Sequence, residues 1–144
     1  MFADFLNSLL APEPEPLDDT DARRALTALL VRMAKSDGYY AASEIMRIEK
    51  IVGKRYGLSH DDAKALRAEA EQLESEAPDT VRFTRAIKDA VAYQDRLAVI
   101  EALWQVALAD GERDAEEDAL VRMAANFLGV SDVDSAKARQ RISG

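Results

Sequence analysis

A short acidic pattern occurs twice in this chain of 144 residues, and its repetition constrains the fold more than any other feature of the sequence. Each copy contains an aspartate, a glycine directly after it, and a glutamate seven residues after the aspartate. The first copy extends from Asp37 to Glu44, and the second extends from Asp110 to Glu117. Apolar positions on both sides of the pattern match at the same offset of 73 residues. A repeat of this length indicates that one helix-turn-helix unit is used twice.

Helical periodicity extends over most of the chain. Beyond residue 19, apolar residues recur at helical spacing in segments 20–35, 43–55, 60–74, 80–92, 96–109, 114–127 and 131–142. Glycine, an apolar residue and serine follow one another at 57–59 and at 129–131, which predicts a left-handed helix end and a cap for the next helix. A turn is expected near residues 93–95, and the apolar segment 96–109 is expected to be the central helix. No stretch alternates with a period of two, so we predict an all-α fold, a compact bundle of about seven to eight helices with an internal pseudo-twofold duplication.

The chain divides into three parts. Residues 1–10 have the periodicity of an amphipathic helix, residues 11–19 are an acidic, proline-containing linker, and residues 20–144 form the helical domain. Within that domain the repeats cover about 20–75 and 95–142. The N-terminal helix is too short to be stable alone in water, so we expect it to pack on its own domain or on a symmetry-related copy. Its polar face has no Lys or Arg, which disfavours a membrane-surface anchor.

Composition excludes several classes of function. The 19 basic and 27 acidic residues leave a net charge of −8, which disfavours binding to nucleic acid or to anionic lipid. The absence of cysteine and the single histidine, His60, remove thiol chemistry, iron–sulfur clusters and most zinc sites. No apolar run approaches the roughly 20 residues of a membrane span. Because the N-terminus also has no signal-peptide pattern, we expect a cytoplasmic protein with no integral membrane segment.

The repeated acids have two explanations. In the first they belong to the turns: Asp-Gly ends one helix and the glutamate begins the next, as in a capping box at residues 114–117. The first copy fits this less well, because Ala41 occupies the matching cap position. In the second, the acids converge on a divalent cation, which would offset the unfavourable position of each aspartate at the negative end of a helix dipole. The candidate metal ligands are then Asp37, Glu44, Asp110 and Glu117. Because the pattern contains no Cys or His, Ca²⁺, Mg²⁺ or Mn²⁺ fits better than Zn²⁺ or Cu²⁺.

The doubled Asp-Gly…Glu pattern and the segment from Arg96 to Gly111 resemble the tellurite-resistance protein B (TerB) family over about residues 20–135. The resemblance implies a compact all-helical domain with an internal duplication. It also implies a role in resistance to tellurite, phage and other stress, with the repeat acids suspected of binding metal. The first copy departs from the usual family pattern, because Tyr39 and Tyr40 follow its glycine where a glutamate is commoner.

Two main hypotheses follow. The first is a non-enzymatic, cytoplasmic stress-response domain that binds a divalent cation and works with other proteins of a stress-response complex. The alternative is an interaction scaffold without metal, which holds a partner in a groove or with the N-terminal helix. A hydrolase that uses paired carboxylates is a third interpretation, and it requires a pocket of acids with raised pKa values. The oligomeric state is open in all three.

Overall fold

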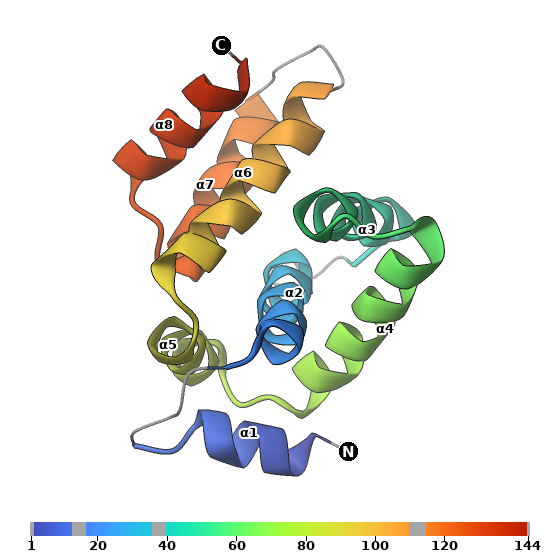
Figure 1. Ribbon diagram of the computed structural model, residues 1–144, viewed down its shortest axis with the longest axis vertical. Helices are drawn as coiled ribbons and strands as arrows, with labels where there is room; N and C mark the ends of the chain where they lie inside the picture. The colour runs from blue at the N-terminus through green and yellow to red at the C-terminus, as the bar shows by residue number, and fades with distance from the viewer. Residues whose placement is uncertain (1, 13–16, 36–39, 110–114, 144) are drawn as a thin grey trace.

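The fold is built from packed α-helices. A computed structural model describes residues 2–12, 17–35, 40–109 and 115–143, with the backbone alone for residues 106–109, 115–118, 120 and 143 (Figure 1). The helices within these ranges are α1 (Ala3–Leu9), α2 (Asp19–Lys35), α3 (Ala42–Tyr56), α4 (His60–Glu76), α5 (Thr80–Ala90), α6 (Tyr93–Ala109), α7 (Ala115–Leu128) and α8 (Asp132–Ser143). Every regular element that the described residues form is helical, which confirms the all-α prediction. Within the same ranges, no helix is both long enough and apolar enough to cross a bilayer.

Helix α2 lies at the centre of the bundle. Its residues 25–31 are all buried, and it contacts α3, α4, α5 and α7. The small side chains of Ala25 and Ala28 let neighbouring helices approach closely, and the Thr27 hydroxyl donates to the carbonyl oxygen of Arg23 (2.7 Å), so its burial leaves no donor unpaired. The segment 96–109, expected to be the central helix, forms α6, which contacts α3, α7 and α8 and buries Val99, Ile100 and Leu103. Helices α2 and α6 therefore both contribute to the interior of the bundle.

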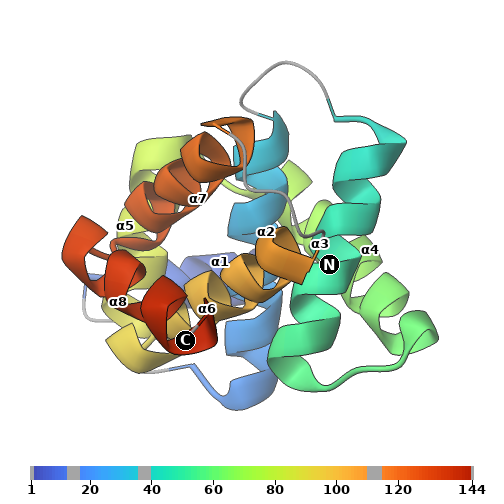
Figure 2. The same ribbon diagram turned by 90° about the horizontal axis from the view of Figure 1, so that it is seen from above.

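Corresponding helices of the two halves begin at a nearly constant separation along the chain. Helix α3 begins at Ala42 and α7 at Ala115, a separation of 73 residues, and α4 begins at His60 and α8 at Asp132, a separation of 72. The packing has the same form, because α2 contacts α4 as α6 contacts α8, and α2 contacts α7 as α6 contacts α3. Figure 2 shows α2 between α7 and α8 on one side and α3 and α4 on the other. These are the contacts that a twofold exchange of the halves requires, and the duplication itself stays a prediction.

The predicted helix ends at the two glycine–serine sites are confirmed. Gly57 (φ 63°) follows α3, and Gly129 (φ 67°) follows α7, both in the left-handed conformation that glycine adopts without strain. The hydroxyls of Ser59 and Ser131 each accept a hydrogen bond (3.1 Å) from the backbone amide three residues later. Each serine therefore caps the helix that follows it.

The reversal between α5 and α6 falls earlier than predicted. Val91 has an extended backbone (φ −117°, ψ 128°), and α6 already begins at Tyr93, so the turn expected at residues 93–95 is wrong. A β-branched valine favours this extended conformation. The Arg96 Nε donates to the carbonyl oxygen of Val91 (3.1 Å) and holds the start of α6 against the break.

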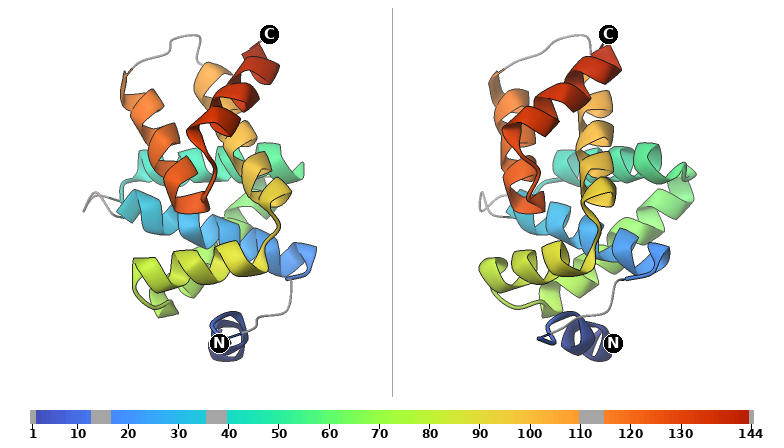
Figure 3. Two further views of the ribbon diagram at one scale, coloured as in Figure 1. Left: turned by 90° about the vertical axis from the view of Figure 1, so that its left-hand side faces the viewer. Right: turned by 60° about the vertical axis from the view of Figure 1, so that its left-hand side comes forward.

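Helix α1 packs across the outer side of α5 (Figure 3). Leu6 and Leu9 are buried, with exposed fractions of 6% and 1%, and Phe2 and Phe5 pack beside them. The N-terminal helix thus packs on its own domain, the first of the two arrangements expected for it.

Candidate functional site

The structure describes the four candidate metal ligands to different extents. Asp37 and Asp110 lie outside the described residues, and of Glu117 only the backbone is described. Glu44 and Glu117 occupy the same position in their helices, the third residue of α3 and of α7. In the ranges that the structure describes, no group of three or more His, Cys, Asp or Glu side chains could hold a metal ion. The convergence of the four acids therefore stays a prediction.

Glu44 is the one candidate ligand whose side chain is described. It is half-buried in the first turn of α3, a helix that begins without a side-chain cap because Ala41 has no oxygen to offer. The Glu44 amide donates to the carbonyl oxygen of Ala41 (3.0 Å), and its carboxylate forms no hydrogen bond or ion pair with another described residue. The described residues therefore form no capping box at this helix start.

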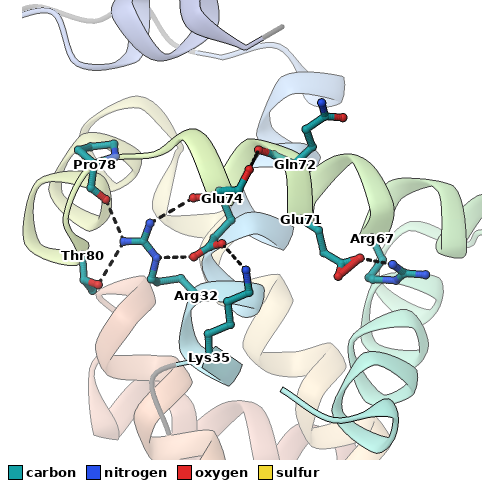
Figure 4. A network of polar contacts seen from close by, with 9 residues as sticks. Arg32, Lys35, Arg67, Glu71, Gln72, Glu74, Pro78 and Thr80 are labelled. Carbon is teal, nitrogen blue, oxygen red and sulfur yellow. Dashed lines mark hydrogen bonds and ion pairs between the residues drawn. The ribbon is translucent and has the colours of Figure 1, made fainter. Parts of the chain in front are cut away.

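The end of α2 that leads to the first acidic turn is held by a buried ion-pair network (Figure 4). Glu74 of α4, 6% exposed, accepts from Arg32 Nε (2.7 Å) and from Lys35 Nζ (2.8 Å), the last residue of α2. The guanidinium of Arg32 also donates to the carbonyl oxygens of Pro78 (2.9 Å) and Glu74 (3.3 Å) and to the hydroxyl of Thr80 (3.2 Å). One arginine therefore ties α2 to the end of α4 and the start of α5.

The charge of Glu74 is set by two opposing effects. Burial alone would raise the pKa of its carboxyl group, because desolvation disfavours the charged form. The hydrogen bonds from Lys35 and Arg32 outweigh burial, and the pKa of Glu74 is lowered. Glu74 is therefore a fixed negative charge near neutral pH and has no proton to donate there.

A second network joins α3 to α4. Arg67 of α4 pairs with Glu49 of α3 (Nε to Oε2, 3.1 Å) and with Glu71 one turn further along α4. The hydroxyl of Tyr40, just before α3, is buried without a partner among the described residues, and burial, followed by the charge of Glu71, raises its pKa. The chain on both sides of the first acidic turn is thus fixed by charged groups, through Lys35 before it and Glu49 after it.

Sequence reasoning misplaced part of α4. The many acids between Asp61 and Glu76, Glu71 and Glu74 among them, predict a solvated face, but Glu74 is buried and Glu71 is in contact with Arg67. The spacing contained a signal, because Arg67 and Glu74 share the helix face of the buried residues Ala63 and Ala70, at intervals of three and four. Two charged residues on an otherwise apolar stripe indicate buried ion pairs rather than a solvated surface.

The place of Trp104 in the most apolar segment of the sequence predicts that it lies in the core, and this prediction is confirmed. It is 6% exposed, and its indole Nε1 donates to the hydroxyl of Ser135 (3.2 Å) in α8. The Arg139 guanidinium lies 5.8 Å from the indole ring. The tryptophan therefore joins α6 to α8 and belongs to the packing of the second half.

Comparison with known proteins identifies the family. Residues 23–140 match the family described as "Tellurite resistance protein TerB". No curated protein and no solved structure matches the chain. The match covers all of the helices from α3 to α7 and most of α2 and α8. An all-α fold and a match over more than half of its length show that the chain belongs to the TerB family.

Proposed function

We propose that this TerB-family chain is a non-enzymatic domain of a cytoplasmic stress response of the tellurite-resistance type, and that it binds a divalent cation. Family membership over residues 23–140 supports the resistance role. Ca²⁺, Mg²⁺ or Mn²⁺ is held by the carboxylates of Asp37, Glu44, Asp110 and Glu117. The observation that carries the cation proposal is the setting of Glu44, a half-buried acid in a helix start with no capping box among the described residues.

The equivalent positions of Glu44 in α3 and Glu117 in α7 support the proposal of two similar half-sites. Glu44 and Glu117 are both third residues of helices whose starts lie 73 residues apart. The helices that precede them, α2 and α6, end at Lys35 and Ala109, so each acidic turn joins an equivalent pair of helices. Carboxylates brought close together repel one another, and a hard cation with oxygen ligands relieves this repulsion.

Isothermal titration calorimetry with Ca²⁺, Mg²⁺ and Mn²⁺ tests the cation proposal. We expect saturable heat for at least one ion with the wild-type protein, and no heat with Asp37→Asn/Asp110→Asn. The single variant Glu44→Gln should weaken binding by about tenfold or more, because it removes one charged ligand from the proposed set.

A matched control uses two acids of α4. Asp61→Asn/Asp62→Asn removes the same number of negative charges from an exposed helix start, and it should leave the binding heat unchanged. Equal loss of heat in both double variants would mean that the cation responds only to the net charge. Wild-type protein that shows neither heat nor a thermal shift with any of the three ions would refute cation binding.

An interaction scaffold without metal is the alternative, and a groove is the observation in its favour. An open groove of about 570 Å³ lies beside α7 and the start of α8, and its lining includes Met123, Asn126 and Val130. The N-terminal helix is the weaker candidate for holding a partner, because its apolar residues Leu6 and Leu9 are buried against the protein's own core. If the titration shows no cation binding, the groove is the surface on which partner binding is to be tested.

A further inference from the structure

A polar cavity lies where α2 begins, α3 ends and α6 begins. Its volume is about 240 Å³, and it is lined by Asp19, Ala22, Arg23, Leu26, Arg55, Tyr56 and Asp95. Figure 2 shows these three helix ends on the same, lower side of the molecule. At about 30 Å³ for each water molecule, the cavity has room for a small polar ligand with some of its hydration water.

Two guanidinium groups lie beside the half-buried Tyr56 in this cavity. The Cζ atom of Arg23 lies 4.7 Å from the centre of the Tyr56 ring, and the Cζ atom of Arg55 lies 4.8 Å from it. Burial raises the pKa of Tyr56 to about 12, although the charges of Arg55 and Arg23 act in the opposite direction. Its hydroxyl therefore stays protonated at neutral pH and can donate a hydrogen bond.

The hydrogen-bond donors of Arg23, Arg55 and Tyr56 are incompletely paired with acceptors among the described residues. Arg55 Nε and the Tyr56 hydroxyl are buried and have no hydrogen-bond partner among the described residues. Arg55 has an ion pair with Asp95, but its Nη2–Oδ1 distance is 3.5 Å, long for a charge-assisted hydrogen bond. Arg23 has the Tyr56 ring as its described side-chain contact and is not paired with a described acid. Buried donors without acceptors are costly, and an acceptor in the cavity would relieve that cost.

The acids of the cavity are more exposed than its tyrosine hydroxyl and Arg55 Nε. Asp19 is exposed, and the side chain of Asp95 is 46% exposed, against 27% for Arg55. Solvated carboxylates at a rim repel an approaching anion only weakly, because water screens their charge. The inner part of the cavity is therefore rich in donors and positive charge, although the protein as a whole has a net charge of −8.

We propose that this cavity is a binding site for a small oxyanion, a phosphate or carboxylate group, held by Arg23 and Arg55 beside Tyr56. A planar guanidinium can pair with either kind of group through two parallel hydrogen bonds. Among the described residues, the lining of this cavity includes none of the proposed cation ligands, so oxyanion binding and cation binding can be tested separately.

Calorimetric titration of the full chain with inorganic phosphate and with acetate, each against chloride at matched ionic strength, tests this proposal. We expect saturable heat and a rise in melting temperature with at least one of the two oxyanions, and the stronger of them identifies the class of ligand. Arg23→Gln and Arg55→Gln should each weaken binding by about tenfold or more, since each removes a charge-assisted contact.

Arg24→Gln is the matched control. Arg24 lies beside Arg23 in α2, but it pairs with Glu69 and Asp21 and does not line the cavity, so its loss should leave oxyanion affinity unchanged. A measurement on the wild-type protein needs no variant to fold: the Nε–Hε resonances of Arg23 and Arg55 should shift with added oxyanion while that of Arg24 does not. Heats equal to those of chloride, or equal weakening by Arg24→Gln and Arg23→Gln, would overturn the site and leave the arginines as ring-stacking groups only.

Discussion

The two left-handed glycines lie in equivalent positions, but their surroundings differ, and this gives a matched pair of substitutions. A Cβ atom added at Gly57 meets nothing within 4 Å. A Cβ atom added at Gly129 would lie 2.8 Å from Lys88 Cε and 2.8 Å from Arg96 Nη1. Lys88 can move aside, but the same Arg96 nitrogen donates to the carbonyl oxygen of Leu128 (2.8 Å) and so holds the end of α7.

The expected costs follow from these contacts. Gly57→Ala should lower the free energy of unfolding by about 1 kcal/mol. The left-handed backbone is unfavourable for alanine, and this cost is partly offset because alanine loses less chain entropy on folding than glycine. Gly129→Ala has the same backbone cost, and it also displaces a charge-assisted hydrogen bond, for a total of about 2–4 kcal/mol. Gly129→Ala should therefore melt several degrees below Gly57→Ala, at about 2–4 °C for each kcal/mol in a chain of this size.

Urea denaturation followed by circular dichroism measures both variants. Repeating Gly129→Ala in an Arg96→Ala background provides the decisive comparison, because the additional cost should disappear once the arginine is gone. Equal costs for the two glycine variants, or an additional cost that persists without Arg96, would refute the assignment of Arg96 as the group that excludes a side chain at Gly129.

Three further predictions concern buried groups. Glu74→Gln should cost about 2–3 kcal/mol, against less than about 1 kcal/mol for the exposed pair member Glu69→Gln, when both are measured in urea. Because the pKa of Glu74 is lowered in the folded state, its contribution is present above pH 4.5, the ordinary value for a glutamate, and is lost as the pH falls through the lowered pKa; a wild-type and Glu74→Gln difference that is constant with pH would contradict this. Tyr56, with a pKa raised to about 12, should add a late step to an ultraviolet titration, and Tyr56→Phe should remove that step. Its contribution to stability should be complete below pH 10 and lost as the pH rises through 12. Deleting residues 1–16 should lower the free energy of unfolding by about 2–4 kcal/mol, because the core loses its apolar contacts with Leu6 and Leu9. An unchanged melting temperature would show that α1 is not part of the core.

Local features of the fold could be predicted from the sequence because their causes are local. Gly57 and Ser59 mark a helix end and a cap through their own backbone and hydroxyl chemistry, and the structure confirms both. Val91 was missed as a break because the periodicity of the preceding segment continues to residue 92, and only a contact with Arg96 shows where the helix stops. Glu74 was misplaced for the same reason, since its partners Arg32 and Lys35 come from another helix.

The candidate sites differ in how far the sequence could lead to them. The repeated acids were found from their spacing alone, but their convergence depends on how the two halves pack and not on any local pattern. Arg23, Arg55 and Tyr56 have no shared motif, and they meet only because the start of α2 lies beside the end of α3. A site assembled from three helices leaves no spacing in the sequence from which it could be found.

The enclosure of α2 determines how the molecule can come apart. Residues 25–31 are surrounded by helices from both halves of the chain, including α4 and α7. A fragment that stops after α4 would present to water the surface that α7 covers, and it should aggregate rather than fold. Backbone amides in this stretch should exchange with solvent hydrogen only when the whole protein unfolds. If a gene doubling produced this chain, each half now buries helices of the other. The two halves should therefore unfold together.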